Sequence, residues 1–257
     1  MNALENQVAI ITGAGSGIGA ATAIRFADED GAVVLVGRTR EQLDRVAQRI
    51  GRPDRVAIVP GDVTQPSTAE GAVRAADERW SRLDVLVSNA ATFNPVAFPD
   101  KSANEWREML DTILMGAFRF AREACRLMIA KKIPGRIVNV TSIHGTQAEA
   151  AASSYGAAKA AVNQFTRCLA VELAQYGIRA NAVAPGFVDT PMSVVDGVNE
   201  LDTPRFQELY VKHRRIPMAR AARPEEIASV ILFLASEASS YVNGHVLVVD
   251  GGLTCTF

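Results

Sequence analysis

Short apolar runs rich in β-branched residues alternate with longer helical segments along the chain, and this alternation restricts the fold more than any other feature. Most runs are continuously apolar, which is typical of strands buried on both faces of a sheet. A strand–helix–strand order repeated this often predicts a parallel sheet with helices on both faces. The expected strands are Val8–Thr12, Val33–Gly37, Val56–Val59, Val85–Ser88, Ile137–Thr141, Ile178–Ala184 and Val246–Val249.

The segments between these runs have helical character. Pro224, followed by Glu225 and Glu226, marks a helix start, because proline suits the first turn and acids favour its positive end. No stretch in the middle has the composition of a linker, so we expect one Rossmann-type α/β domain over residues 1–257, doubly wound around a mostly parallel seven-stranded sheet. The expected helices are Ala20–Glu29, Glu41–Ile50, Ala69–Trp80, Glu105–Ala130, Ser154–Tyr176 and Glu225–Ala235.

Composition excludes several classes of partner. Lys plus Arg (27) nearly balances Asp plus Glu (28), which argues against nucleic acid or a membrane surface as a long-range electrostatic partner. The chain has neither a signal-peptide pattern after Met1 nor an apolar stretch of the roughly 20 residues that cross a bilayer, so we expect a cytoplasmic protein. Cys125, Cys168 and Cys255 fit no disulfide framework and no zinc spacing, and we expect no metal site.

In a sheet of this kind ligands bind beyond the carboxyl ends of the strands. Directly after the first expected strand, glycines stand at positions 13, 15, 17 and 19. Glycines there let the chain turn sharply and let backbone N–H groups approach a pyrophosphate at a helix N-terminus. A tight structural turn is the alternative, but the loop also opens the first helix of a βαβ unit. We therefore expect it to bind a dinucleotide.

The end of the second expected strand bears on which dinucleotide is bound. Units that bind NAD carry an acid about 20 residues beyond the glycines, which holds the ribose 2′-hydroxyl. Here the strand ends in Gly37 and Arg38, and no acid occurs before Glu41. A carboxylate would repel a 2′-phosphate, whereas Arg38 offers it a charge-assisted, bidentate pair. This favours NADP(H); a solvated arginine and an NAD(H) cofactor are the alternative.

Two residues of one helix offer proton-transfer chemistry. Tyr155 and Lys159 are four residues apart and so share one helix face. Free tyrosine titrates near 10, but a neighbouring ammonium and an oxidised nicotinamide ring would favour the phenolate and lower that pKa. The pair is therefore suited to proton exchange with a substrate oxygen while hydride moves. A tyrosine and a lysine at this spacing are also common by chance.

A serine makes the combination more specific. Ser142 follows an expected central strand thirteen residues before Tyr155, where its hydroxyl could hydrogen-bond the substrate oxygen. No GxSxG sequence surrounds Ser142, which argues against a nucleophilic serine. His144 is a candidate for the substrate pocket and equally for a base.

In these features the chain resembles the single-domain short-chain dehydrogenases/reductases along nearly its whole length. The glycine stretch resembles the family's TGxxxGxG loop, Ser142 with Tyr155 and Lys159 its serine and YxxxK positions, and Pro185–Thr190 its PGxxxT segment. The resemblance implies an adenine contact, an NNAG-like segment, and a hold on the nicotinamide carboxamide by Val188 and Thr190. The cofactor contacts that we expect are Gly13, Ser16, Gly17, Ile18, Gly19, Arg38, Asp62, Val63, Asn89, Ala90, Tyr155, Lys159, Pro185, Gly186, Val188 and Thr190.

The chain departs from the family pattern at two places. Ser88 and Ala91 replace the first Asn and the Gly of the NNAG segment. The family also carries a catalytic asparagine seven residues after a tryptophan, and counting from Trp106 leads to Ile113. An isoleucine side chain cannot support the water that the asparagine holds beside the active-site lysine. Either Thr112 or another polar group replaces it, or proton transfer is slower.

The leading hypothesis is an NADP(H)-dependent oxidoreductase that interconverts a secondary alcohol and a carbonyl, with Ser142, Tyr155 and Lys159 as catalytic residues. The alternatives are the same chemistry with NAD(H), or a nucleotide-binding regulator that has lost turnover, which only Ile113 favours. The small-molecule substrate would contact Ser142, His144 and Tyr155, with a substrate loop at about residues 186–217. The family resemblance also implies a homotetramer.

Overall fold

Seven parallel strands form the sheet that the apolar runs predict, and every neighbouring pair in it is parallel. The computed structural model describes residues 2–195 and 197–255. Asp196, which falls in the expected substrate loop, lies outside the described residues, as do both chain ends. The strands are β1 (Val8–Thr12), β2 (Ala32–Gly37), β3 (Val56–Pro60), β4 (Val85–Ser88), β5 (Arg136–Val140), β6 (Arg179–Pro185) and β9 (Val246–Val249).

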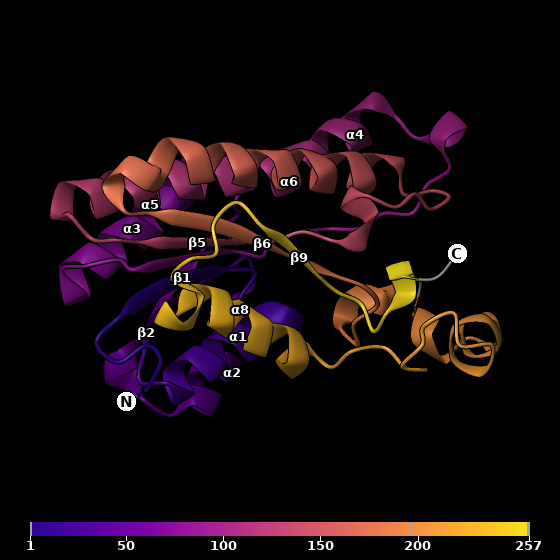
Figure 1. Ribbon diagram of the computed structural model, residues 1–257, viewed down its shortest axis with the longest axis horizontal. Coiled ribbons are helices and arrows are strands. Elements are labelled where there is room, and N and C mark those ends of the chain that lie inside the picture. The colour runs from indigo at the N-terminus through magenta and orange to yellow at the C-terminus, as the bar shows by residue number, and fades with distance from the viewer. Residues whose placement is uncertain (1, 196, 256–257) are drawn as a thin grey trace.

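Helices cover both faces of the sheet (Figure 1). One face carries α1 (Gly17–Asp28), α2 (Arg40–Ile50) and α8 (Pro224–Ala235). The other carries α3 (Pro66–Trp80), α5 (Gly116–Lys131) and α6 (Ser153–Leu173), and α4 (Ala103–Leu110) extends beyond the sheet. Each face has its own core, with Phe26 fully buried on the first and Phe120 on the second. The predicted doubly wound α/β fold is confirmed.

The helix expected over residues 105–130 is present, but it is not α-helical throughout. A π-helical segment, Asp111–Met115, separates α4 from α5. Such segments insert one extra residue into the hydrogen-bonding pattern and occur often at functional sites.

Short elements complete the chain. Strands β7 (Val194–Val195) and β8 (Val198–Asn199) pair antiparallel, and α7 (Pro204–Phe206) leads into a π-helical segment, Gln207–Lys212. No helix in the described part of the chain is long and apolar enough to span a membrane. The short 3₁₀ helices are Pro53–Arg55, Phe98–Asp100, Ile143–Gly145, Ala174–Tyr176, Pro191–Ser193, Glu200–Asp202, Glu237–Ser239 and Leu253–Cys255.

The strand order β3-β2-β1-β4-β5-β6-β9 places the site. The chain first adds strands on one side of β1 and then on the other, so the order reverses between β1 and β4. Connections leave in opposite directions there, and the diverging loops open a crevice outside the carboxyl ends of the strands. The glycine loop, between β1 and α1, lies at this point.

The glycine loop is too closely packed to accept side chains. Gly13 has a φ of +65°, a conformation that glycine adopts readily. A Cβ at Gly19 would lie 2.2 Å from the Gly13 carbonyl oxygen and 2.6 Å from the Asn89 side-chain nitrogen. Both neighbours belong to the loop or to the strand end beside it, so neither can give way without moving the loop.

We predict that Gly19→Ala weakens binding of the dinucleotide far more than it lowers global stability, because the clash displaces the loop rather than the core. Gly71→Ala is the matched control, since a Cβ there would meet its nearest neighbour only at 3.9 Å. Fluorescence titration with the cofactor and thermal unfolding of both variants test this. Unchanged cofactor affinity in Gly19→Ala would contradict the prediction.

Candidate active site

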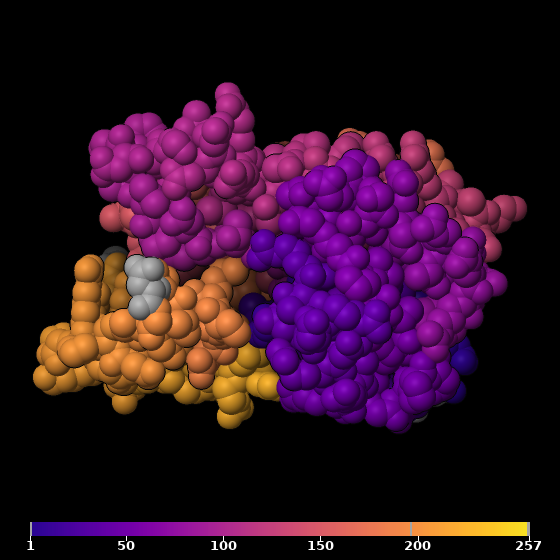
Figure 2. Space-filling view, turned by 180° about the vertical axis from the view of Figure 1, so that it is seen from behind, coloured from indigo at the N-terminus to yellow at the C-terminus, as the bar shows by residue number. Residues whose placement is uncertain are grey.

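A cleft of about 580 Å³ opens at the carboxyl ends of the strands. Figure 2 shows the molecule hollowed between its indigo half and the magenta and orange segments. The volume falls in the range of about 300–1,000 Å³ that is typical of small-molecule sites. Of the expected cofactor contacts, those that line the cleft are Gly13, Ser16, Gly17, Ile18, Arg38, Asp62, Val63, Asn89, Ala90 and Thr190.

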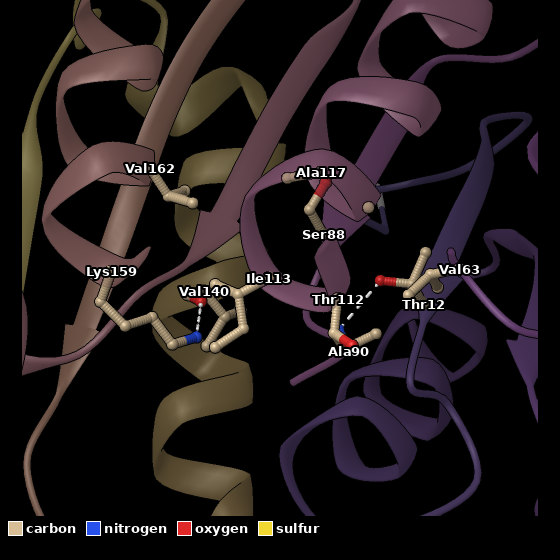
Figure 3. Close-up of a pocket in the computed structure, with 11 residues that line it drawn as sticks. Thr12, Val63, Ser88, Ala90, Thr112, Ile113, Ala117, Val140, Lys159 and Val162 are labelled. Carbon is tan, nitrogen blue, oxygen red and sulfur yellow. Dashed lines mark hydrogen bonds between the residues drawn. The ribbon is translucent and has the colours of Figure 1, made fainter. Parts of the chain in front are cut away.

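Other expected cofactor contacts lie behind or beside the cleft. Gly19 is buried in the first turn of α1, and Val188 is buried where it pairs with Ala222. Pro185 ends β6, and the space beside Gly186 is filled by Asp250. Lys159 lines a separate small cavity of about 10 Å³ (Figure 3). Sequence reasoning missed Gln42, Glu108 and Asp111 as cleft-lining residues, because no strand end precedes them.

Arg38 stands at the edge of the cleft with an exposed side chain. Among the described residues it has neither a hydrogen-bond nor an ion-pair partner. Arg40 differs, because its Nε lies 2.9 Å from a carboxylate oxygen of Asp44. Arg38 therefore offers an uncompensated guanidinium to any anion that enters the cleft.

The Thr12 hydroxyl joins the ends of β1 and β4. Its oxygen accepts hydrogen bonds from the backbone N–H groups of Asn89 (2.9 Å) and Ala90 (3.0 Å). The Asn89 side chain returns the contact by donating to the carbonyls of Thr12 (3.0 Å) and Gly13 (3.3 Å). This network sets the spacing between the glycine loop and the β4 end. Thr12 was absent from the predicted site, although its position as the last residue of β1 was a usable signal.

The three catalytic candidates meet at the end of β5. Ser142 follows that strand, and α6 carries Tyr155 and Lys159 on one buried face. The Lys159 ammonium donates to the Val140 carbonyl at 2.8 Å and lies 5.4 Å from the centre of the Tyr155 ring. The structure thus brings these residues together as their spacing predicts.

Burial dominates the electrostatics of this group. It raises the pKa of Tyr155 to about 12, against a smaller opposing effect of a hydrogen bond with Ser142. It also lowers the pKa of Lys159 to about 7. The expected lowering of the tyrosine pKa is therefore wrong for the chain without a bound cofactor, because burial of the phenol itself raises that pKa.

His144 lies against Tyr155, as we expect of a residue of the candidate substrate pocket. Its ring meets Tyr155 edge-on at 5.8 Å, and its Nε2 lies 2.7 Å from a carboxylate oxygen of Glu149. The hydrogen bond with His144 holds the pKa of Glu149 below its usual range. Phe93 packs on Tyr155 as well, with the ring centres 5.1 Å apart.

The expected substrate loop has its own apolar cluster. Phe187, Phe206 and Tyr210 pack against one another with tilted or edge-on rings whose centres are 4.8–5.0 Å apart. Burial, and next the charge of Glu149, raises the pKa of Glu200. The loop therefore reaches the surroundings of the His144–Glu149 pair.

Comparison with known proteins identifies the family. A family model described as enoyl-(acyl carrier protein) reductase matches residues 13–254. The chain is 42% identical over 254 residues to cis-4-hydroxycyclohexanecarboxylate dehydrogenase of Sinomonas cyclohexanicum, covering 98% of each protein. It is 38% identical to a 3-oxoacyl-(acyl-carrier-protein) reductase of Thermotoga maritima, covering 97% of this chain and 98% of that protein.

Solved structures indicate the same family. A short-chain dehydrogenase/reductase of unknown function from Caenorhabditis elegans, determined with cofactor, superposes with a TM-score of 0.91 at 34% identity, covering 99% of this chain and 97% of that one. One from Brucella melitensis gives 0.89 at 34% identity and covers 98% of each chain. The chain belongs to the short-chain dehydrogenase/reductase family. It is an oxidoreductase that acts on alcohol or carbonyl groups.

We predict that Thr12→Val lowers the free energy of unfolding by about 1–3 kcal/mol, because it leaves two part-buried N–H groups, those of Asn89 and Ala90, without an acceptor. Thr22→Val is the matched control, since that buried hydroxyl only donates to the Ile18 carbonyl in the preceding turn. Urea unfolding of both variants measures the difference. Equal losses would show that the Thr12 network contributes nothing beyond ordinary burial.

Proposed function

We propose that the protein is an NADP(H)-dependent oxidoreductase that interconverts a secondary alcohol and a carbonyl, with Tyr155 as the acid and base. The observation that carries the proposal is the meeting of Ser142, Tyr155 and Lys159 at the end of β5. No catalysis follows from composition or fold alone, since one fold serves many functions.

The cleft fits a dinucleotide. Helix α1 begins at Gly17 without a side-chain cap from Ser16, so its first-turn N–H groups and its positive end are available to a pyrophosphate. Asp62 and Val63 would adjoin the adenine, and Val188 and Thr190 the carboxamide, as the family resemblance implies. The nicotinamide would supply or accept the hydride.

The chain's own residues would handle the proton. In carbonyl reduction Tyr155 would donate its phenolic proton to the substrate oxygen, which Ser142 holds by a hydrogen bond. With a pKa of about 12, Tyr155 carries this proton at neutral pH. Lys159 would stabilise the phenolate that remains. In the reverse direction the phenolate would take the proton back.

Arg38 supports the assignment of NADP(H) as the cofactor. Its exposed, uncompensated guanidinium lines the part of the cleft formed by the end of β2, and Gly37, the residue before it, has no carboxylate to repel a phosphate. NAD(H) with the same chemistry is the alternative, in which Arg38 is merely solvated.

A nucleotide-binding regulator without turnover is the candidate from another class. Ile113 favours it, because its side chain cannot make the contacts of the family's asparagine. The grouping of Ser142, Tyr155 and Lys159 opposes it, because a regulator needs no buried lysine beside a buried tyrosine. Oxidation of NADPH in the presence of a carbonyl panel separates the two.

The relatives guide the choice of substrates. The panel should contain cyclic hydroxy acids with the matching ketones, and 3-oxoacyl thioesters, since the names of two relatives refer to such compounds. We propose that residues 186–217 form the substrate loop of one catalytic unit spanning residues 1–257. The homotetramer stays a prediction from the resemblance.

We predict that Tyr155→Phe lowers kcat at least about 100-fold and leaves the Kd for the cofactor within about twofold, because only the titratable oxygen is lost. Tyr176→Phe, on an exposed tyrosine, is the control and should keep full activity. Steady-state kinetics and cofactor titration measure both. An active Tyr155→Phe enzyme would end the proposed mechanism.

We predict that Arg38→Ala weakens NADP(H) binding by roughly 1.5–3 kcal/mol, the contribution of a hydrogen bond to a charged group, and barely affects NAD(H). Arg40→Ala is the matched control, because Arg40 is the neighbouring arginine that already pairs with Asp44. Kinetics with both cofactors decide. Equal losses for NADP(H) and NAD(H) in Arg38→Ala, or a native preference for NAD(H), would favour the alternative cofactor.

A further inference from the structure

One stretch of chain beside the site has little regular structure. Residues 91–101, which we call the strap, run from the end of β4 toward the start of α4, and the short 3₁₀ helix Phe98–Asp100 interrupts their irregular course. The strap projects with α4 past the end of the sheet (Figure 1). Its first residues, Ala91 and Thr92, line the large cleft.

The strap also covers the tyrosine of the site. The Phe93 ring packs edge-on against the Tyr155 ring, with the ring centres 5.1 Å apart and an angle of 71° between the ring planes. Ala91 and Phe93 pack against the same apolar cluster that contains Tyr155. With this cover Tyr155 is 8% exposed. The position of the strap therefore bears on how far water reaches the phenol.

Few hydrogen bonds hold the strap in place. Those that its backbone N–H groups donate to carbonyls of the described residues all stay within the strap. The Asn94 side chain donates to a carboxylate oxygen of Glu105 at 3.1 Å, but Glu105 lies on α4, the next element along the chain. Among the described residues, the hydrogen bond that ties the strap to a distant element comes from Lys101.

Lys101 joins both parts of the strap to α6. Its ammonium donates to the Asn94 carbonyl at 2.7 Å and to the Ser154 hydroxyl at 3.1 Å. Ser154 is fully buried in the first turn of α6, directly before Tyr155. Lys101 is the one hydrogen-bond partner of that hydroxyl among the described residues. Such a bond from a charged donor is strong, and a buried hydroxyl that loses its partner is costly.

We propose that Lys101 is a positioning residue for Tyr155. Its hydrogen bond to Ser154 fastens the strap to α6, and the fastened strap keeps the Phe93 ring against the phenol and water away from it. One contact thereby couples the strap, whose first residues line the large cleft, to the surroundings of the tyrosine. The consequence for turnover rests on the proposed function, in which Tyr155 exchanges a proton with the substrate.

The sign of a pKa change separates this role from a direct effect of charge. Burial raises the pKa of Tyr155 to about 12, so water that reaches the phenol lowers this pKa. Removal of a nearby ammonium by itself raises the pKa instead, because a positive charge favours the phenolate. The other polar groups that face Tyr155 are the Ser142 hydroxyl, the Lys159 ammonium and the His144 ring, and Lys101→Met changes none of them.

The test uses the protein without cofactor, so it does not depend on turnover. In Lys101→Met, which keeps an unbranched stem and loses the ammonium, the pKa of Tyr155 should fall by about one pH unit or more toward its ordinary value near 10. NMR titration of ring-labelled tyrosine, assigned with Tyr155→Phe, measures this pKa. Hydrogen exchange of the strap amides should become faster, because the strap is released.

Ser154→Ala should produce the same two changes. The double variant Lys101→Met/Ser154→Ala should exceed neither single variant, because both substitutions remove one and the same contact. In an active enzyme Lys101→Met should lower kcat/KM by about 10-fold, since the phenol and its wall lose their fixed geometry, and should leave the Kd for the cofactor within about twofold.

Lys101→Arg and Lys131→Met are the matched controls. Arginine restores a charged donor, so Lys101→Arg should keep most of the native pKa and exchange rate. Lys131 ends α5 and pairs with Asp77 at the edge of the sheet where β5 begins, opposite the site, so Lys131→Met should change neither quantity.

The proposal is overturned if the Tyr155 pKa and the strap exchange are the same in wild type, Lys101→Met and Ser154→Ala. It is also overturned if the pKa rises in Lys101→Met, or if Lys131→Met lowers it as far. If the protein shows no oxidoreductase activity while pKa and exchange behave as expected, the proposed function fails and the role of Lys101 in positioning Tyr155 stands.

Discussion

The hydroxyl of Thr12 holds together the two strand ends on which the site depends. Parallel strands expose unpaired backbone groups where they stop, and at the end of β1 and β4 these groups must be satisfied without filling the crevice. The Thr12 hydroxyl accepts hydrogen bonds from the backbone N–H groups of Asn89 and Ala90, and the Asn89 side chain donates a hydrogen bond to the Thr12 carbonyl. Because the loop glycines have no room for a Cβ, this small network defines where the loop lies.

The second constraint is the depth of α6. Its buried face brings Tyr155 and Lys159 out of water, which moves their pKa values to about 12 and about 7. Both shifts disfavour the charged form. The chain by itself therefore keeps the phenol protonated and brings the pKa of the lysine to about 7, near neutral pH. Charge at this site is therefore governed by whatever hydrogen-bonds the ammonium and by what enters the cleft, rather than by the Tyr–Lys spacing alone.

Sequence patterns were sufficient for the strands and insufficient for the segment at 111–115. Each of the seven expected strands lies within two residues of the observed ends, since strands buried on both faces are continuously apolar. The π-helical segment left no comparable signal within the helix expected there. At the site, the glycine loop and the Ser142, Tyr155 and Lys159 group were found from residue types at strand ends and helix spacing. Thr12 was missed, because its role consists of contacts to residues that are distant in the chain.

The amino-acid sequence by itself determined the doubly wound sheet, and it indicated the edge of the sheet and the side chains at which we propose that the chemistry takes place. These depend on local periodicity and on glycine, serine and arginine at strand ends, which can be recognised from the sequence without the structure. Only the tertiary structure decided that, among the described residues, Arg38 is unpaired while Arg40 is paired, and that the buried Ser88 hydroxyl lacks a hydrogen-bond partner. Burial and hydrogen-bond satisfaction decide such properties, and both depend on what residues far apart in the chain leave uncovered.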